Sequence, residues 1–320
     1  MSLPSLVEIN TLAHSLTEDQ SVEHVYGTEL DWICDKFTQG LSVLVECDKQ
    51  LTTYLYRALR GRLKQRFNNP FQLNLLSGQV QGDASGMALN QIQMMIQQLR
   101  EAVLSGEINQ ILVLPHLDIL STSGGGVLSM DTRETVSLLY ENPEAIFLAF
   151  KDPSFELPEV ISNLFPAHKS LIGIARDMLP RLITQQEARK FGWTHFNPYA
   201  LYKYFSGLNA IRCRQILGNL VNRMDYDEHY PERLHALYQN IREMTLPGNV
   251  ELPHVDLEKE IGGYASVKRH IRSELLDLLH FKQQQTDPQA IQQLESLLPK
   301  GIIFYGPPGT GKTFFAKAIA

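Results

Sequence analysis

The residues with the clearest chemical potential form one short run near the C-terminus. Two glycines with four residues between them are followed directly by a lysine and a threonine. The run consists of Gly306, Pro307, Pro308, Gly309, Thr310, Gly311, Lys312 and Thr313. It fits G-x-x-x-x-G-K-[ST], a loop whose backbone N–H groups surround phosphate oxygens. We therefore predict a nucleoside triphosphate site in which Lys312 contacts the β- and γ-phosphates and the Thr313 hydroxyl joins the Mg²⁺ shell.

The residues on either side of this loop are typical of the elements that would position it. Residues 301–305 have the pattern of a short buried strand, and residues 314–320 have the pattern of a starting helix. A strand, a glycine-rich turn and a helix place backbone N–H groups and a helix N-terminus around one anion. We include Phe314, at the start of this helix, in the predicted nucleotide-binding set.

Hydrolysis needs further groups that the sequence does not supply after the loop. A nucleoside triphosphatase needs an acidic strand end for the metal and a residue that orients the attacking water, and both follow the phosphate loop in such folds. The sequence stops at Ala320. We therefore expect a fragment of a longer protein, with the catalytic residues beyond residue 320, that carries part of an ATP site and does not hydrolyse ATP alone.

Composition places the chain among globular proteins and disfavours several other classes. Hydrophobic residues make up 43% and charged residues 20% of the 320 residues, as in soluble proteins of about two domains. No window approaches the ~18 apolar residues that cross a membrane, and the N-terminus lacks the order of a signal peptide. The three cysteines are scattered, which favours reduced thiols in the cytoplasm and no metal other than Mg²⁺.

A basic stretch at residues 57–66 has two interpretations. It is either the solvated face of an amphipathic helix or a patch that binds nucleic acid. The net charge of −6 gives no support to extensive nucleic-acid binding. We therefore favour the solvated face and expect no nucleic-acid partner.

Strand and helix patterns alternate through the first half of the chain. Strand patterns lie at residues 41–45, 71–76, 111–114, 145–150 and 171–174, with helix patterns at 51–65, 89–104 and 132–140. This alternation predicts an α/β domain with a largely parallel sheet. From residue 184 the patterns are helical only, at 185–191, 198–205, 209–224 and 231–243. The predicted parts are an extension at 1–25, an α/β domain at 26–183, a helical subdomain at 184–245, a linker at 246–254 and a second unit at 255–320.

Three segments of the second unit carry a resemblance to a known family. They are Ile261-Gly262-Gly263-Tyr264, the following helix with Val267-Lys268, and residues 298–313. Together they resemble the opening of an AAA+ ATPase module, closest to the branch of the FtsH-like proteases and Cdc48-like unfoldases. The resemblance implies that Ile261, Gly262 and Gly263 lie against the adenine, where missing side chains let the backbone approach a flat base. Taken alone, the glycine pair indicates only a turn.

Residues 26–250 resemble the same architecture with its chemistry removed. Residues 41–53 look like a strand and a phosphate loop that has lost its glycines, so the backbone cannot easily curl around a phosphate. Pro115-His116 stand where the family has Asp-Glu, and Asp118 lies two or three residues too far beyond the strand end to replace them. Lys151 stands in the region of the polar residue that senses the γ-phosphate.

The remaining matches in this part are thinner. Residues 163–168 resemble the arginine-finger region without its arginines, and residues 205–209 resemble the start of a lid helix. The resemblance implies an AAA+-like parallel sheet sandwiched by helices, a helical lid, and then the truncated start of a second P-loop α/β module. An unrelated α/β domain is the alternative for the first part.

The resemblance also implies a function. In this family, rings of subunits couple ATP hydrolysis to the remodelling or unfolding of protein substrates. We hypothesise a chaperone-like AAA+ ATPase with ATP and Mg²⁺ as cofactors, a protein substrate or partner, a homo-oligomeric ring, and an inactive first module that serves assembly or recruitment. The alternative is a non-enzymatic scaffold or regulatory protein with a vestigial nucleotide site, which the intact Lys312-Thr313 pair disfavours. A DNA-acting motor is a third hypothesis, which the acidic balance disfavours.

Overall fold

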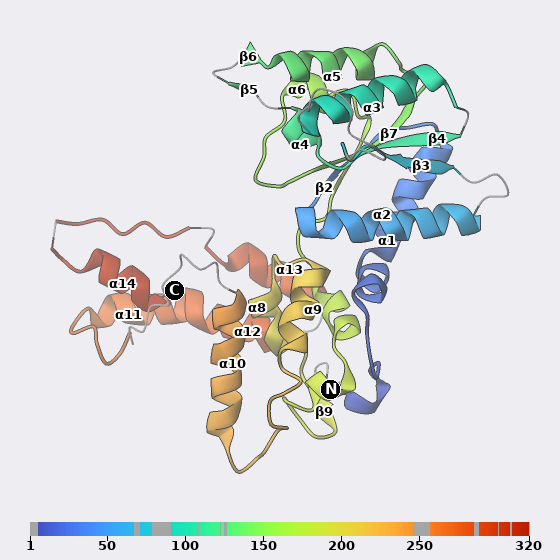
Figure 1. Cartoon of the computed structure of the whole chain (residues 1–320). Helices are drawn as coiled ribbons and strands as arrows, with labels where there is room; N and C mark the ends of the chain where they lie inside the picture. Colours follow the sequence, from blue (N-terminus) through green and yellow to red (C-terminus); the bar gives the residue numbers. More distant parts are fainter. Residues whose placement is uncertain are drawn as a thin grey trace. The chain divides into compact units, whose positions relative to one another are not determined.

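The computed structural model describes residues 6–66, 71–78, 91–107, 109–121, 123–124, 127–245, 257–284, 288–299, 301–307 and 309–319. The contacts within the chain divide it into two units, both drawn in Figure 1. The sheet unit comprises residues 13–184 and 205–219, and the helical unit comprises residues 1–12, 185–204 and 220–320. The predicted linker at 246–254 lies outside the described residues.

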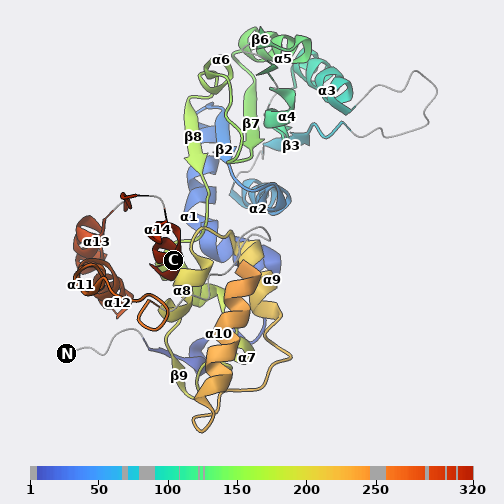
Figure 2. The same ribbon diagram turned by 90° about the vertical axis from the view of Figure 1, so that its left-hand side faces the viewer.

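A five-stranded parallel sheet forms the centre of the sheet unit (Figure 2). Its strands are β2 (Val43–Glu46), β3 (Gln72–Leu75), β4 (Gln110–Leu114), β7 (Ile146–Lys151) and β8 (Ala167–Ser170). They lie in the order β3-β4-β7-β2-β8, and each neighbouring pair runs parallel. The predicted α/β class is confirmed, and the sheet is consistent with an AAA+-like P-loop fold.

Helices cover both faces of this sheet because its central strands are apolar on both sides. On one face, α3 (Gln91–Ser105) and α5 (Met130–Tyr140) pack against alternate residues of the strands. The buried members of that cluster include Met95, Leu99, Leu112, Leu114, Leu139, Phe147 and Ala149. The intervening strand residues are also buried, and α1 (Glu18–Thr38) and α2 (Lys49–Arg66) lie over that second face (Figure 1).

Helix α1 corrects the prediction for the N-terminal end of the chain. The side chains of Thr17 and Gln20 accept hydrogen bonds from each other's backbone N–H, which fixes the start of the helix. The helix then runs past residue 25, where we expected a peripheral extension to end. Its inward side chains Val22, Leu30, Ile33 and Phe37 are fully buried. The polar residues of its first turns form only the outer face of a core helix.

The fifth strand also differs from the prediction. We expected it at residues 171–174, but β8 ends at Ser170, which pairs with Glu46 of β2. Leu171 donates one further hydrogen bond to the Glu46 carbonyl, at 2.8 Å, and Gly173 then turns the chain with a φ of +73°. The apolar residues Leu171 and Ile174 are therefore buried beyond the strand. The edge strand itself is partly polar because one of its sides has no neighbour among the described strands.

The sheet unit contains several shorter elements. They are α4 (Leu117–Leu120), β5 (Ser123–Gly124), β6 (Val127–Leu128), α6 (Glu159–Ser162), the 3₁₀ helix η2 (Arg176–Leu182) and α9 (Ala210–Gly218). Helix α9 packs on α1 and α2. It ends earlier than the predicted 209–224, and it belongs to the sheet unit although we placed it in the helical subdomain.

The helical unit begins with a strand pair that the helical pattern did not predict. Strand β1 (Val7–Glu8) pairs antiparallel with β9 (His195–Phe196). The neighbouring helices are η1 (Ile9–Thr11), α7 (Gln185–Ala188), α8 (Tyr199–Phe205) and α10 (Pro231–Thr245). None of the helices that the structure describes is long and apolar enough to span a bilayer.

The C-terminal segment, residues 257–319, has a small core of its own. Its helices are α11 (Ala265–Ile271), the π-helical turn η3 (Arg272–Leu276), α12 (Asp277–Gln284), α13 (Pro288–Leu297) and α14 (Lys312–Ile319). Leu257, Ile261, Ile271 and Phe315 form the buried cluster.

The strand predicted at residues 301–305 is not formed. The side chains of Ile303 and Tyr305 are 88% and 92% exposed. A strand is held by a ladder of hydrogen bonds to a neighbour, and no described strand lies beside these residues. Their apolar character alone therefore does not produce a strand here.

The central strand β7 offers a direct test of the core. Leu148 is fully buried in β7, whereas Leu104 on α3 is 78% exposed. We expect Leu148→Ala to lower the free energy of unfolding by about 3 kcal/mol, because it leaves a cavity between sheet and helices. Leu104→Ala should change it by less than about 0.5 kcal/mol. Urea unfolding followed by circular dichroism measures both, and equal midpoints for the two variants would contradict this core.

Candidate functional site

The predicted phosphate loop leads directly into α14 and contains two glycines in the left-handed region. Gly309 and Gly311 both have a φ of +79°, a conformation that residues with a Cβ rarely adopt. Turns of this kind aim successive N–H groups at one point. The loop is exposed, so a ligand has access to it. Pro308 lies outside the described residues.

Lys312 folds back over this loop. Its Nζ donates to the carbonyl oxygens of Gly306 at 3.0 Å and Pro307 at 2.7 Å. The Thr310 hydroxyl also donates to the Pro307 carbonyl, at 2.9 Å. The described partners of the Lys312 amine are thus neutral oxygens, which bind an ammonium more weakly than phosphate oxygens do. The residues present fit a phosphate group.

The two residues after Lys312 share the exposed start of α14. Thr313 and Phe314 are exposed, whereas Phe315 is buried and holds the helix on the core of the segment. The Thr313 hydroxyl is accessible to a nucleotide-bound Mg²⁺. Among the described residues, no group of three histidine, cysteine, aspartate or glutamate side chains is placed to hold a metal by itself.

The structure brings the segment Ile261-Gly262-Gly263 to the same core as the phosphate loop. Ile261 and Phe315 belong to one buried cluster. The next residue, Tyr264, packs its ring edge-on against Phe315 at a centroid distance of 6.0 Å, and its hydroxyl donates to the Thr310 carbonyl at 3.5 Å. The segments expected on the adenine and phosphate sides of one nucleotide therefore lie on one core, although Ile261 and Gly306 are 45 positions apart in the chain.

Comparison with known proteins found one matching family model and several similar relatives. Residues 302–320 match a model of the ATPase family associated with various cellular activities (AAA). The C-terminal segment is similar to FtsH-like AAA+ ATPases. The ATP-dependent zinc metalloprotease FtsH of Acidimicrobium ferrooxidans is 43% identical over 61 residues, which are 19% of this chain and 8% of that protein. FtsH 2 of Methylacidiphilum infernorum is 42% identical over 62 residues, 19% of this chain and 9% of the relative.

A third relative gives the same result. FtsH of Marinobacter nauticus is 43% identical over 61 residues, again 19% of this chain and 8% of the relative. The chain thus spans less than a tenth of the length of the curated FtsH proteins that it matches. The AAA+ similarity applies to a short part of the chain, and the family model within it covers residues 302–320.

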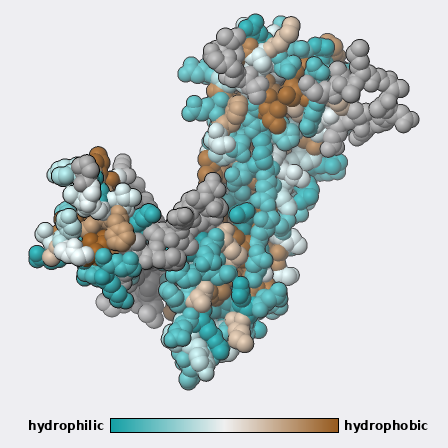
Figure 3. Space-filling view, turned by 60° about the vertical axis from the view of Figure 1, so that its left-hand side comes forward, coloured by the Kyte–Doolittle hydropathy of each residue, from teal (hydrophilic) through white to brown (hydrophobic). Residues whose placement is uncertain are grey.

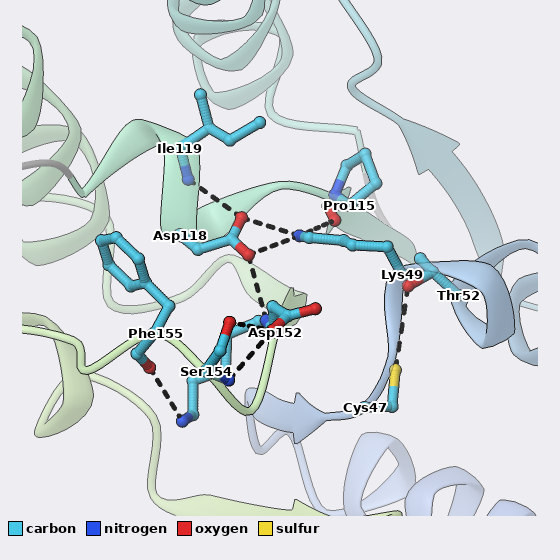
Figure 4. A network of polar contacts seen from close by, with 10 residues as sticks. Cys47, Lys49, Thr52, Pro115, Asp118, Ile119, Asp152, Ser154 and Phe155 are labelled. Carbon is cyan, nitrogen blue, oxygen red and sulfur yellow. Dashed lines mark hydrogen bonds and ion pairs between the residues drawn. The ribbon is translucent and has the colours of Figure 1, made fainter. Parts of the chain in front are cut away.

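The sheet unit has its own cluster of charged residues at the carboxyl ends of β2, β4 and β7 (Figure 4). The Asp118 carboxylate, which is 6% exposed, contacts the Lys49 ammonium at 2.7 Å. It also accepts the N–H of Ile119 at 2.9 Å and the N–H of Asp152 at 3.0 Å. Lys49 donates further to the carbonyl of Pro115 at 3.2 Å. One carboxylate therefore ties together residues that follow three different strands.

Asp118 reaches the strand ends because α4 folds back immediately after β4. We expected Asp118 to lie too far beyond the strand end to replace the missing acidic pair, and the structure gives it a different role, as the ion-pair partner of Lys49. The signal in the sequence that could have indicated this contact was the pair of opposite charges, Lys49 after one strand and Asp118 after another. Parallel strands end at one edge of the sheet, so residues that follow them can meet there. A second pair, Lys151 with Glu46 at 2.6 Å, lies at the same edge.

Two further residues of this edge have shifted acidity. Burial and the Lys49 charge lower the pKa of His116, so the imidazole is neutral where the AAA+ pattern has a carboxylate. Hydrogen bonds from the hydroxyl and the N–H of Ser154 lower the pKa of Asp152, so that this carboxylate remains ionised.

Where an AAA+ module has its phosphate loop, the sheet unit has helix. Helix α2 begins at Lys49, three residues after β2 ends at Glu46. In the C-terminal segment, by contrast, the glycine-containing turn precedes α14 at Lys312. Without glycines the backbone of residues 47–48 passes directly into the helix, and no cradle of N–H groups is formed.

The basic stretch at residues 57–66 lies on α2 and is paired with α1. Three of its four arginines contact carboxylates across the helix pair. The contacts are Arg57–Asp19 at 2.9 Å, Arg62–Asp31 at 2.6 Å, Arg62–Glu23, and Arg66–Asp35 at 2.8 Å. Because these charges are compensated within the fold, they favour the solvated helix face over a nucleic-acid patch.

The thiols of the chain provide a test that depends on pH. Burial raises the pKa of Cys34 to about 11, of Cys47 to about 12 and of Cys213 to about 12. Only the thiolate reacts with a maleimide, so at pH 8 the native thiols should react more than about a hundredfold slower than free cysteine. The rate should rise with pH and reach the free-cysteine value in denaturant. Rapid labelling of any of the three in the native chain at pH 8 would contradict this burial.

Proposed function

We propose that this chain provides the nucleotide-binding start of an AAA+ ATPase that couples ATP hydrolysis to the remodelling or unfolding of protein substrates. The observation that carries the proposal is the shared core of the two halves of the site: a glycine cradle with Lys312, and the segment Ile261-Gly262-Gly263. Bound ATP supplies the phosphates and Mg²⁺ the charge neutralisation. The protein would act as a homo-oligomeric ring in the cytoplasm, where the three free cysteines stay reduced.

Each predicted site residue has a role in this proposal. The N–H groups of residues 306–311 and of the start of α14 hold phosphate oxygens. The Lys312 amine leaves the carbonyls of Gly306 and Pro307 for the β- and γ-phosphates, and the Thr313 hydroxyl joins the Mg²⁺ shell. Phe314 borders the cradle, and the Ile261–Gly263 backbone lies against the adenine.

Removal of the Lys312 amine tests the nucleotide site. We expect Lys312→Ala to weaken Mg-ATP binding by the chain at least about tenfold, since it removes a charge-assisted contact to phosphate. Lys317→Ala, on the exposed side of the same helix, should leave binding within about twofold. Isothermal calorimetry measures both. If ATP binds with equal affinity to wild type and Lys312→Ala, the C-terminal segment is not the site, and a scaffold protein with a vestigial nucleotide site becomes the better description.

We further propose that the sheet unit is an inactive module that serves assembly or recruitment. The support is the Asp118 network: its ion pair with Lys49 takes up the cation that a phosphate would need, and its other oxygen is held by the Asp152 N–H. The glycine-free passage into α2 supports the same conclusion. An anion at this edge would have to break a nearly buried ion pair and leave Asp118 without its cation, which is costly.

Asp118→Ala separates a structural role from nucleotide binding. We expect the free energy of unfolding to fall by about 2 kcal/mol, because the N–H groups of Ile119 and Asp152 and the Lys49 ammonium lose their acceptor. Lys49→Met should also lower this free energy, since it leaves the Asp118 carboxylate, which is 6% exposed, without its cation. Mg-ATP affinity should be unchanged in both variants. Loss of ATP binding in Asp118→Ala, with the fold intact by circular dichroism, would place the nucleotide in the sheet unit.

A further inference from the structure

Lys268 on α11 is a buried lysine that the nucleotide chemistry described above does not use. The residue is 9% exposed, and lysines are rarely buried without a partner that compensates the charge. Its Nζ donates to the carbonyl oxygen of Ile261 at 2.5 Å. The Glu258 carboxylate lies 3.9 Å from the same Nζ and pairs with Arg272 at 2.8 Å. The ammonium is thus fixed at one backbone carbonyl, in the segment expected against the base.

That hydrogen bond determines the direction of the next N–H group. A trans peptide unit is planar, so the C=O of Ile261 and the N–H of Gly262 point in opposite directions. Because the C=O faces Lys268, the Gly262 N–H faces away from α11. Gly262 is exposed, and none of the described residues accepts a hydrogen bond from it.

The position of this N–H relative to the phosphate loop is also held. The Ile261 side chain is buried in the cluster that contains Phe315 of α14. Tyr264 contacts the loop through the Thr310 carbonyl, although its φ of +53° is strained for an aromatic residue. Strain of this kind persists only where the surroundings fix it.

We propose that Lys268 is a positioning residue, whose hydrogen bond to the Ile261 carbonyl holds the Gly262 N–H as a donor to an acceptor nitrogen of the adenine ring. This inference rests on the proposed function and deepens it, because it assigns base recognition to a contact separate from the phosphate loop. Phosphate affinity then depends on Lys312, and the additional affinity for the base depends on Lys268 and Gly262.

Two ligands separate these contributions: Mg-ATP, and Mg-tripolyphosphate, which has the phosphates without a base. We expect Lys268→Met to weaken ATP binding by the full chain about tenfold, the loss of one well-placed hydrogen bond. Tripolyphosphate affinity should stay within about twofold. Lys259→Met, which removes an equal charge from an exposed position, should change neither affinity. Equal losses for both ligands in Lys268→Met, or no loss for ATP, would overturn the inference.

A second pair of variants tests the N–H group itself and leaves Lys268 in place. Nothing lies within 4 Å of a Cβ built on Gly262, and its φ is outside the left-handed region. Gly262→Ala keeps the N–H and should keep ATP affinity. Gly262→Pro removes the N–H and should weaken ATP about tenfold without weakening tripolyphosphate. Equal ATP affinity in the two variants would overturn the inference even if Lys268→Met failed to fold.

Amide NMR without nucleotide distinguishes failure of this inference from failure of the proposed function. Because Lys268 orients the peptide between Ile261 and Gly262, the amide resonances of Gly262 and Gly263 should shift or broaden in Lys268→Met and not in Lys259→Met, while those of α14 stay unchanged. If the wild type binds neither ligand, the proposed nucleotide site fails, and these resonances alone decide the role of Lys268. Unchanged resonances of the two glycines in Lys268→Met would then overturn it.

Discussion

The Asp118 carboxylate is the interaction on which the carboxyl edge of the central sheet depends. The carboxyl ends of parallel strands lie at the same edge of a sheet. The turns that follow the strands therefore bring polar backbone groups and charged side chains close together. In this fold Asp118 accepts from Lys49 and from the N–H groups of Ile119 and Asp152. Those contacts join the ends of β2, β4 and β7. A P-loop fold commonly places its ligand at this edge of the sheet. Here the polar groups of the edge are instead hydrogen-bonded to the protein's own residues.

Two passages lead into a helix, one from β2 into α2 and one from residues 306–311 into α14, and they differ in their glycines. Between residues 306 and 311 positive φ angles open a turn before α14. Between β2 and α2 there is no glycine, and the helix begins at Lys49. Both helices have free N–H groups in their first turn, but only a turn with positive φ angles can aim further N–H groups at the same anion. The glycines of residues 306–311 therefore distinguish the passage before α14 from the one before α2.

The sequence predicted the features that depend on local pattern. The alternation of apolar strands and helices gave the α/β class, and the spacing of Gly306, Gly311 and Lys312 located the loop. The misplaced features depend on neighbouring segments. The fifth strand was assigned to residues 171–174 because they are apolar, yet Leu171 and Ile174 are buried beyond the strand end. Residues 301–305 were assigned to a strand that needs a partner. The roles of Asp118 and Lys268 depend on contacts 69 and 7 residues away along the chain, which no local pattern contains.

Three lysines show how the oxygen that each contacts separates their roles. Lys49 faces a carboxylate, so its charge is neutralised, and an approaching anion gains little from it. Lys268 is buried against one backbone carbonyl, so its bond orients a peptide and is poorly accessible to a ligand. Lys312 is held by the carbonyls of its own loop. Neutral oxygens hold an ammonium in place without cancelling its charge, and the amine can exchange them for phosphate oxygens at small cost. Of the three, Lys312 therefore has the charge, the accessibility and the weak attachment that a phosphate-binding lysine requires. The surroundings of Lys49 favour a role in holding the fold, and those of Lys268 favour a role in orienting the backbone.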